Sequence, residues 1–310
     1  MENIKVLSVN VSEKKGTIKV PVEKIFLTNI GIEGDAHSGK WHRQVSLLGK
    51  ESIDKAEHEV GRRLAYGEFA ENITTEGLPL YRMKPLDRLE YGKLLLEVTQ
   101  IGKKCHGANC SIFQETGNCV MPKEGIFCRV IGDGELKAGD LLEYRPRVIS
   151  VHIITLSDRA SQGIYEDKSG PLLRKLSETF FSEVGRSATI ENSVIPDDEI
   201  QLEARLKSLI EKDTDIIFTT GGTGIGPRDI TPDVVKALLD KEIPGIMEMI
   251  RVKYGMQFPN ALISRSVAGV AGKTLIYVLP GNPKAVKEYS DEIFKTVEHS
   301  FRMLYNIDEH

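Results

Sequence analysis

The sequence lacks the features that mark membrane, secreted and nucleic-acid-binding proteins. None of its apolar runs is long enough to span a bilayer. Its start, MENIKVLSVN, lacks the basic, apolar and small-residue pattern of a secretion signal. Lys and Arg are scattered and the formal net charge is only −4, which argues against binding to a nucleic-acid backbone. We therefore expect a cytoplasmic protein whose partners include neither membrane nor nucleic acid.

Cysteine is scarce and unevenly placed. The chain has four cysteines, all within one short window of the first half: Cys105, Cys110, Cys119 and Cys128. In a cytoplasmic protein of this size, such cysteines are more typical of free thiols than of a disulfide framework. We therefore expect the thiols to be reduced.

The 310 residues divide into two halves with different patterns. The first half contains short apolar runs between Gly, Asp and Asn turns, with one amphipathic helix expected over 50–64, which predicts a barrel or a strongly bent sheet. From Val148 on, continuous apolar runs alternate with helical spacing, which predicts a mostly parallel α/β sheet covered on both faces. The polar segment 145–147 between the halves gives domains at 1–145 and 148–310.

The second half contains a glycine-rich loop, TTGGTGIGPRDITPD, after the apolar strand DIIFTT. Ligands bind at that end of strands in open α/β sheets, and glycines let a ligand approach the backbone amides. The helix expected to begin near Thr231 adds unsatisfied N–H donors, which suits a phosphate. The spacing matches neither a P-loop nor a dinucleotide fingerprint. A purely structural turn is the alternative.

A carboxylate, Asp229, lies within this loop. It would repel phosphate unless a cation stood between them, so Mg²⁺ is the expected partner; a turn or cap residue is the alternative. Three other loops, SDRASQGIYEDKSGP, VIPDDEI and LPGNPKAV, would gather beside it if the sheet is doubly wound. The pair Asp197-Asp198 fits a helix cap and fits a metal or substrate ligand equally well.

These segments resemble the signature motifs of the MogA/MoaB family, the molybdopterin-binding domain of molybdenum cofactor biosynthesis. The resemblance runs from about Val148 to near the C-terminus and implies a three-layer α/β fold, commonly trimeric. The best-known family members transfer AMP from Mg-ATP to the phosphate of molybdopterin and release pyrophosphate. The resemblance therefore implies ATP, Mg²⁺ and molybdopterin as ligands, and a homo-oligomer with a trimer favoured.

The same resemblance assigns roles to individual residues. It implies that Asp229 and Asp197 are catalytic acids and that Asp229 holds the metal. The residues implied to bind nucleotide and pterin are Ser157, Asp158, Ser169, Gly170, Gly221, Gly222, Thr223, Gly224, Arg228, Pro280, Gly281, Asn282 and Pro283. A non-catalytic carrier or storage protein for the cofactor is the alternative, because sequence does not separate close binding from transition-state binding.

The first half offers two further candidates. Cys105 and Cys110 lie in a loop with basic neighbours, which lower a thiol pKa and favour accessible thiolates. Metal binding that includes His106 is one alternative, and burial as a small apolar residue, which suits Cys128, is another.

The second candidate in this half is Gly34-Asp35 with His37, His42 and Arg43, which fits an anion site or, equally, a solvated loop. Glu71-Asn72 in GEFAENI fits a turn.

The segments GIEGDAHSG, GEFAENI, the cysteine loop and GIFCRVIGDGELKAGD together resemble the MOSC domain, over roughly Ile4 to Tyr144. That resemblance implies a β-barrel-like fold that binds the molybdenum cofactor, sulfurates it or hands it on. It gives the sulfur or molybdenum role to Cys110, with Cys105 as its partner. It also implies a sulfur donor, a molybdate-insertion protein or a molybdoenzyme as a protein partner.

Overall fold

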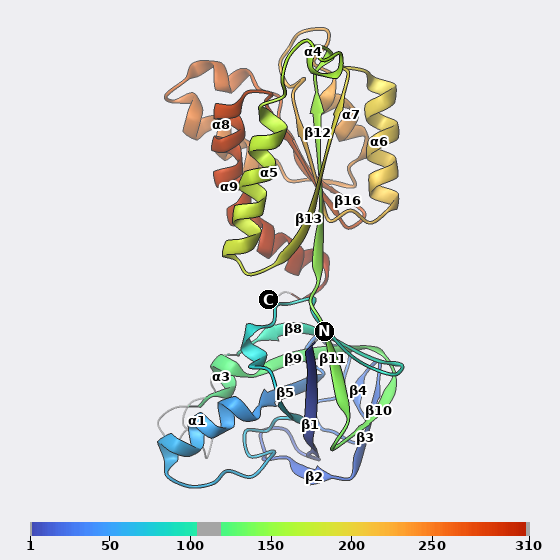
Figure 1. Ribbon diagram of the computed structural model, residues 1–310, viewed down its shortest axis with the longest axis vertical. Coiled ribbons are helices and arrows are strands. Elements are labelled where there is room, and N and C mark those ends of the chain that lie inside the picture. Colours follow the sequence, from blue (N-terminus) through green and yellow to red (C-terminus); the bar gives the residue numbers. More distant parts are fainter. Residues whose placement is uncertain (1, 104–118, 308–310) are drawn as a thin grey trace. The chain divides into compact units, whose positions relative to one another are not determined.

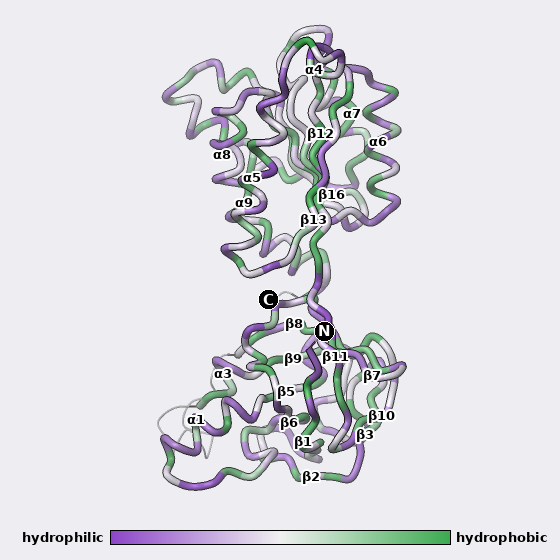
Figure 2. Tube along the Cα trace, in the orientation of Figure 1, coloured by the Kyte–Doolittle hydropathy of each residue, from purple (hydrophilic) through white to green (hydrophobic). Residues whose placement is uncertain are grey.

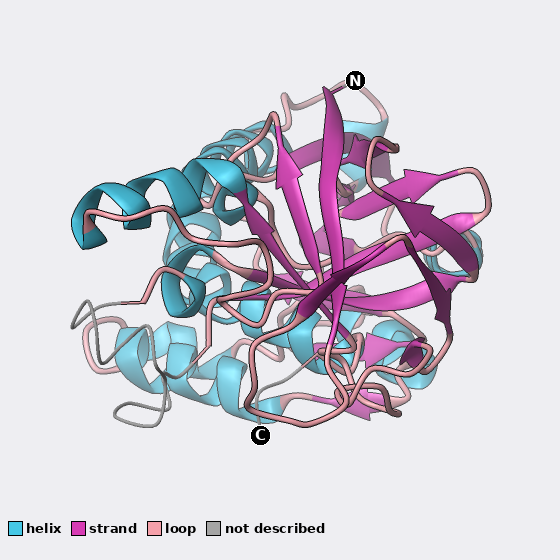
Figure 3. Cartoon of the chain, turned by 90° about the horizontal axis from the view of Figure 1, so that it is seen from below, coloured by secondary structure: helices cyan, strands magenta, loops and turns pink. Residues whose placement is uncertain are grey.

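The computed structural model describes residues 2–103 and 119–307, which divide into two compact units (Figure 1). The first unit is Met1–Arg147 together with Tyr305–His310, and the second is Val148–Leu304. Figure 3 marks helix and strand along the chain. No helix in the described part is both long and apolar enough to cross a bilayer.

The first unit is a closed β-barrel, as the sequence predicts. Its strands are β1 (Glu2–Val11), β2 (Val20–Val22), β3 (Lys24–Thr28), β4 (Gly31–Ile32), β5 (Val45–Gly49), β6 (Ile73–Glu76), β7 (Arg88–Tyr91), β8 (Leu94–Ile101), β9 (Ile126–Gly132), β10 (Gly134–Lys137) and β11 (Leu141–Arg145). Among the described residues, the ring runs β11-β7-β8-β9-β5-β6-β1 and closes where β1 pairs with β11. Strands β10, β3 and β4 form a separate small sheet.

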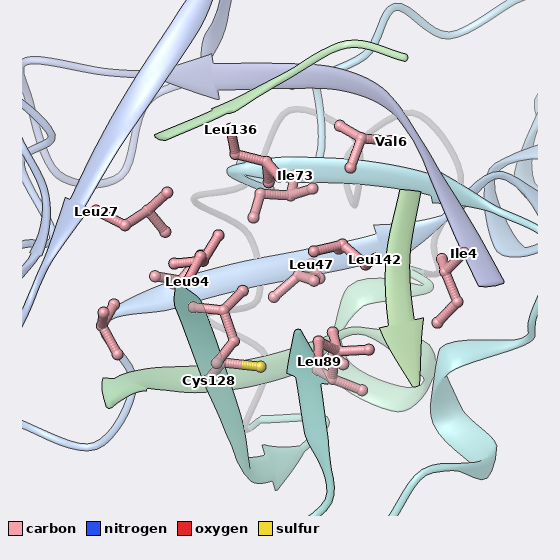
Figure 4. Close-up of a cluster of buried hydrophobic side chains, with 14 of the residues drawn as sticks. Ile4, Val6, Leu27, Leu47, Ile73, Leu89, Leu94, Cys128, Leu136 and Leu142 are labelled. Atoms are coloured by element: carbon pink, nitrogen blue, oxygen red, sulfur yellow. The ribbon is translucent and has the colours of Figure 1, made fainter. Parts of the chain in front are cut away.

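Apolar side chains from all around the ring fill the barrel (Figure 4). Because successive side chains of a strand point to opposite faces, alternate residues such as Ile4 and Val6 on β1 point inward. Cys128 on β9 lies in this core and is fully buried, in agreement with the packing role expected for it. Burial raises the pKa of its thiol well above the ordinary range, so this cysteine is not a thiolate.

Three short helical segments accompany the barrel: α1 (Lys50–Val60), η1 (Leu80–Arg82) and α3 (Met121–Glu124). The helix predicted over 50–64 therefore exists but ends earlier. Gly61 adopts the left-handed conformation, with φ of 73°, and its N–H bonds to the carbonyl oxygen of Glu57 at 2.9 Å. A left-handed glycine is a common way for a helix to end, and it stops α1 before Leu64.

The second unit is a mostly parallel sheet with helices on both faces, which confirms the predicted fold class. Its strands are β12 (Val148–Leu156), β13 (Ser187–Ile195), β14 (Ile216–Thr220), β15 (Lys241–Glu242), β16 (Ala268–Ala271) and β17 (Thr274–Leu279). The strand order is β13-β12-β14-β17-β16-β15. The first four strands in that order run parallel, and β16 is antiparallel to β17.

Helices cover the sheet in two layers (Figure 1). They are α4 (Asp158–Ser161), α5 (Ser169–Glu183), α6 (Glu199–Glu211), α7 (Thr231–Leu238), α8 (Pro244–Gly255), η3 (Pro259–Ile263) and α9 (Pro283–Leu304). Helix α5 contacts α9 on one face, and α6 contacts α7 on the other. Hydrophobic and hydrophilic residues alternate along α6 (Figure 2), as expected for a helix with one buried side.

The strand order creates a switch point beside β12. The chain leaves β12 for β13 on one side and returns to β14 on the other. In open α/β sheets, ligands bind in the crevice outside the carboxyl ends of strands at such a point. The loops after Leu156 and Thr220 meet there.

Candidate functional site

The glycine loop after β14 lies against the end of β12. Gly221 has φ of 107° and Gly222 has φ of 62°, where side chains are disfavoured. A Cβ on Gly221 would lie 2.4 Å from the carbonyl oxygen of Leu156. Thr231, the first residue of α7, fixes the other side of the loop by donating its hydroxyl to the Gly221 carbonyl oxygen at 2.9 Å. Glycine at these positions therefore lets the loop close over the switch point.

Asp229 turns back onto the same loop. Its Oδ2 accepts the Gly226 N–H at 2.9 Å, and a Cβ on Gly224 would lie 2.7 Å from this oxygen. The Oδ1 atom accepts no hydrogen bond from any residue that the structure describes. One carboxylate oxygen thus orients the side chain, and the other is open to a ligand.

Asp158 and Asp197 hold two further loops together at the switch point. The backbone N–H of Asp158 donates to Oδ2 of Asp197 at 3.2 Å, and the N–H of Asp197 donates to Oδ1 of Asp158 at 3.0 Å. Ser157 caps the short helix α4, and Arg228 of the glycine loop pairs with the Asp158 carboxylate. The ends of β12, β13 and β14 therefore contribute to one site.

The carboxylates of Asp197 and Asp229 are close enough to interact. Burial raises the pKa of Asp197, and the negative charge of Asp229 raises it further. No group of three or more His, Cys, Asp or Glu side chains suited to a metal is found in the described part of the chain. Two carboxylates fit Mg²⁺, which takes one or two protein carboxylates and completes its shell with phosphate and water oxygens.

A second turn packs beside the glycine loop. Asp167 Oδ1 accepts the backbone N–H groups of Ser169 and Gly170 at 2.9 and 3.0 Å. The Ser169 hydroxyl donates to the carbonyl oxygen of Gly281 at 3.0 Å. A Cβ on Gly281 would lie 3.1 Å from Cα of Gly221, so the loop after β17 also reaches the site.

A cavity of about 380 Å³ opens next to the glycine loop. Thr223 and Gly224 line it at one side, and Pro280 and Asn282 at another. Asn282 also caps α9 by accepting the Ala285 N–H at 2.9 Å. The volume of the cavity falls within the range of small-molecule sites, about 300–1,000 Å³.

In the first unit, the candidate residues around Asp35 form a buried polar network. Asp35 Oδ2 accepts hydrogen bonds from Lys19 Nζ at 2.5 Å and from Asn72 Nδ2 at 3.1 Å, and Oδ1 accepts the His37 N–H at 2.9 Å. Burial alone would raise the pKa of Asp35, but hydrogen bonds from His37 and Lys19 and the Lys19 charge outweigh it and lower the pKa. Glu71 and Asn72 are both buried, so they belong to this network rather than to an exposed turn.

Each of the two units matches a known protein family. Residues 34–143 match the family model of the MOSC domain, and residues 152–299 match that of a probable molybdopterin binding domain. The molybdopterin adenylyltransferase of Helicobacter pylori strain J99 is 35% identical over 155 residues, which cover 49% of this chain and 86% of that protein. The chain belongs to the MogA/MoaB family of molybdopterin-binding proteins.

Two other matches concern the same half. The molybdenum cofactor synthesis protein cinnamon of Drosophila melanogaster is 36% identical over 158 residues, 50% of this chain but only 26% of that protein. This chain thus spans about a quarter of that relative. The solved structure of the Mog protein from Mycobacterium ulcerans has 34% identity and a TM-score of 0.47, and covers 52% of this chain and 99% of that one.

The structure of this MogA/MoaB-type unit brings most of the predicted residues together. Those that take part in the contacts described above or line the cavity are Ser157, Asp158, Ser169, Gly170, Asp197, Gly221, Gly222, Thr223, Gly224, Arg228, Asp229, Pro280, Gly281 and Asn282. Pro283 is the first residue of α9. The neighbouring Asp198 caps α6 by accepting the Gln201 N–H at 2.8 Å, so the two members of the acidic pair have different roles.

In the MOSC half, the structure brings only some of the candidate residues together. His37 and Arg43 line one cavity, whereas His42 is not among its described lining residues. Cys105, His106 and Cys110 lie outside the residues that the structure describes.

Two residues that shape the site, Arg265 and Asp167, were not predicted from the sequence. The backbone N–H of Arg265 donates to the Thr223 carbonyl oxygen at 2.9 Å. Its side chain donates through Nε to the Gly224 carbonyl oxygen at 2.7 Å and also bonds the Asp229 carbonyl oxygen. It lies 36 residues beyond Asp229 in a segment without a local motif. The only available signal was that loop carbonyl groups must find donors.

Proposed function

We propose that the second unit transfers AMP from Mg-ATP to the phosphate of molybdopterin. The observation that carries the proposal is the pair of interacting carboxylates, Asp197 and Asp229, beside a glycine loop whose backbone is open to phosphates. The enzyme name of the Helicobacter pylori relative supports the same reaction.

In this reaction, an oxygen of the pterin phosphate forms a bond to the α-phosphorus of ATP. The bond from the α-phosphorus to the bridging oxygen breaks, and pyrophosphate leaves with that oxygen. Backbone N–H groups of the loop 222–225 and the N-terminus of α9 bind phosphate oxygens. The unsatisfied donors expected near Thr231 are not available, because the N–H groups at the start of α7 donate to the carbonyl oxygens of Gly222 and Ile230. Arg228, oriented by Asp158, supplies a positive charge near the transferred group.

Asp229 and Asp197 would hold Mg²⁺, which neutralises phosphate charge when bound. The open Oδ1 of Asp229 is the atom available for this purpose. No protein nucleophile is required, because positioning and charge neutralisation are the main demands of such transfers.

Pyrophosphate release on incubation with molybdopterin and Mg-ATP tests the proposal. We expect Asp229→Asn to lower the rate about 10²–10³-fold, the usual loss for one group that stabilises transition-state charge. Asp198→Asn is the matched control, because asparagine also caps helices and Asp198 lies outside the carboxylate pair. Tight binding of molybdopterin without turnover in the unmodified protein would instead support a carrier or storage protein.

For the MOSC unit, we infer that it binds a later form of the cofactor and sulfurates it or hands it on. Cys110, with Cys105 as its partner, would carry the sulfur or ligate the metal, and a sulfur donor or recipient enzyme would dock there. The support is the match to the MOSC family model. Alkylation that continues well below the ordinary thiol pKa of about 8.5 at either cysteine would support a functional thiolate.

We further infer that the protein forms a homo-oligomer, with a trimer favoured. Exposed apolar side chains on α8 and directly after its end, namely Met249, Val252 and Met256, support an interface. Sedimentation equilibrium gives the subunit number directly, and a monomer at micromolar concentration would contradict the inference.

A further inference from the structure

Helix α8 exposes an apolar stripe opposite its buried face. Met247 and Ile250 are buried against the rest of the unit. Met249, Val252 and Met256 are instead 48%, 59% and 85% exposed. Met256 directly follows α8 and keeps helical backbone angles, with φ of −63° and ψ of −27°. Because residues three and four apart lie on the same side of a helix, these three side chains form one line.

The spacing of this stripe is that of a seam between two helices. In helices that pack side by side, apolar seam residues alternate at steps of three and four, and charged residues beside the seam form ion pairs between the helices. Glu248 comes directly before Met249, and Lys253 comes directly after Val252. Since one helical turn takes 3.6 residues, the two charged residues lie on opposite flanks of the stripe.

The two flanks carry opposite charge. Glu248 is exposed and forms no ion pair with any residue that the structure describes. On the other flank, Lys253 Nζ bonds Glu292 Oε1 at 2.5 Å, and Lys295 Nζ bonds Glu292 Oε2 at 2.8 Å. Two lysines therefore share one carboxylate, which leaves positive charge on that flank. An ammonium group has three N–H donors, so Lys253 keeps donors for a second carboxylate.

This order of charges selects a parallel second copy of the chain. When two α8 helices run parallel, the Glu248 flank of one faces the Lys253 flank of the other. When they run antiparallel, each flank faces the same flank of the other helix, and like charges meet. The parallel arrangement is therefore the complementary one. Repeated around an axis along α8, it closes into a ring.

Helix α8 also leads directly into one wall of the cavity beside the glycine loop. Phe258, Ala261 and Ser264 line that cavity. The Phe258 N–H bonds the carbonyl oxygen of Tyr254 in α8 at 2.8 Å. Arg265, which bonds the glycine loop, comes directly after Ser264. Contacts that restrain α8 therefore also restrain the cavity wall and Arg265.

We propose that α8 is the seam through which copies of this chain associate in parallel, and that this association fixes the cavity wall. Glu248 of one copy pairs with Lys253 of the partner subunit. The seam deepens the homo-oligomer inferred above, and its effect on the cavity rests on the AMP-transfer site proposed there. Removal of the apolar stripe from water favours the association.

Sedimentation equilibrium of the full-length protein tests the seam. Met249→Asp places a charge within the stripe and should raise the dissociation constant of the assembly at least tenfold. The matched control is Met303→Asp, which changes an exposed methionine near the end of α9 and should leave the constant unchanged. Circular dichroism verifies that both variants are folded. An assembly that is equally tight in Met249→Asp and in the unmodified protein would overturn the seam.

Charge reversal tests the parallel orientation. Glu248→Lys should raise the dissociation constant about threefold or more, because it replaces an attraction by a repulsion in each contact. Addition of Lys253→Glu should restore most of the affinity, and Lys295 still neutralises Glu292 in this double variant. Glu211→Lys, at the exposed end of α6, is the control and should have no effect. A double variant no tighter than Glu248→Lys alone would overturn the parallel pairing.

Hydrogen exchange tests whether association fixes the cavity wall. The hydrogen-bonded backbone N–H groups of Phe258 and Arg265 should exchange at least tenfold faster in Met249→Asp than in the unmodified protein. The N–H groups of the central strand β14 should exchange equally in both. Equal exchange at Phe258 and Arg265 would overturn the effect on the cavity. None of these measurements uses ATP or molybdopterin, so absence of pyrophosphate release would contradict the AMP-transfer proposal alone.

Discussion

At the scale of single residues, Arg265 shows how one side chain can set the shape of a ligand loop. The side-chain donors of Arg265 bond the carbonyl oxygens of Gly224 and Asp229, and its Nη1 pairs with Asp233 at 2.8 Å. The backbone N–H of the same residue bonds the carbonyl oxygen of Thr223. These contacts span the loop from the first glycines to the start of α7. Arg265 therefore positions the loop, although no contact with substrate is implied.

Replacing Arg265 by alanine should lower the rate of pyrophosphate release by about tenfold to a hundredfold, because small displacements of positioned groups have effects of that size. Added guanidinium should restore part of the rate, which a merely structural role would not predict. Arg251→Ala is the control, because Arg251 also bonds a backbone carbonyl, that of Ser266 at 3.0 Å, without touching the glycine loop. An equal loss in both variants would contradict the role of Arg265.

The raised pKa of Asp197 predicts how the free energy of unfolding depends on pH. Its folded pKa is raised by burial and by Asp229, so the fold favours the protonated form. The resulting stability is present below the unfolded pKa of about 3.9 and is lost as pH rises through the folded pKa. At pH 7, Asp197→Asn should therefore be slightly more stable than the unmodified protein, although less active.

Urea unfolding measured between pH 3 and pH 8 checks this sign. The stability difference should grow as pH rises and shrink when Mg²⁺ is added, since a bound cation relieves the repulsion. Asp198→Asn should show no such growth, because Asp198 acts as a helix cap. A difference that is constant with pH would show that Asp197 is not under electrostatic strain.

At the scale of elements, the glycine loop depends on two close approaches of the backbone. Gly221→Ala would place a Cβ 2.4 Å from the Leu156 carbonyl oxygen at φ of 107°. We expect a loss of about 2–4 kcal/mol in the unfolding free energy, from overlap and from strained backbone. Gly245→Ala in α8, where no heavy atom lies within 4 Å of the new Cβ, should instead gain about 0.5–1 kcal/mol. Similar effects of the two substitutions in urea unfolding would contradict this account.

Local pattern predicted the elements whose cause is local. Continuous apolar runs predicted β12, β14 and β17 as strands buried on both faces. The closure of the barrel by β1 and β11 depends on pairing between residues more than a hundred positions apart, such as Ile4 and Leu142. No local pattern encodes that pairing.

The residues of the candidate site also divide into those that a local pattern predicts and those that it does not. Asp229 and the glycines were predicted because their chemistry is contained in one segment. Lys19 and Arg265 were not, because each acts on residues far away in sequence: Lys19 pairs with Asp35 inside the barrel, and Arg265 bonds the glycine loop. An ordinary lysine or arginine in sequence gives no sign of burial.

At the scale of the whole molecule, a unit that matches the MOSC family model and a unit that matches a probable molybdopterin binding domain are joined by a short polar segment. We expect channelling between them to depend on that covalent link. Cutting the full-length protein at a protease site inserted within 145–147 should slow maturation of the cofactor in a recipient enzyme but leave pyrophosphate release intact. The control is the same protein left uncut, and equal maturation rates would rule out channelling.

The sheets of the two units also differ in whether their edge strands are paired. The described strands of the barrel ring close on themselves, whereas β13 in the second unit pairs with β12 on one side and with no other described strand on its other side. An open strand of nine residues exposes a row of backbone donors and acceptors that can pair with another chain. When the protein is heated or held at high concentration, aggregation should therefore begin from the second unit, with β13 as the first strand to join two molecules.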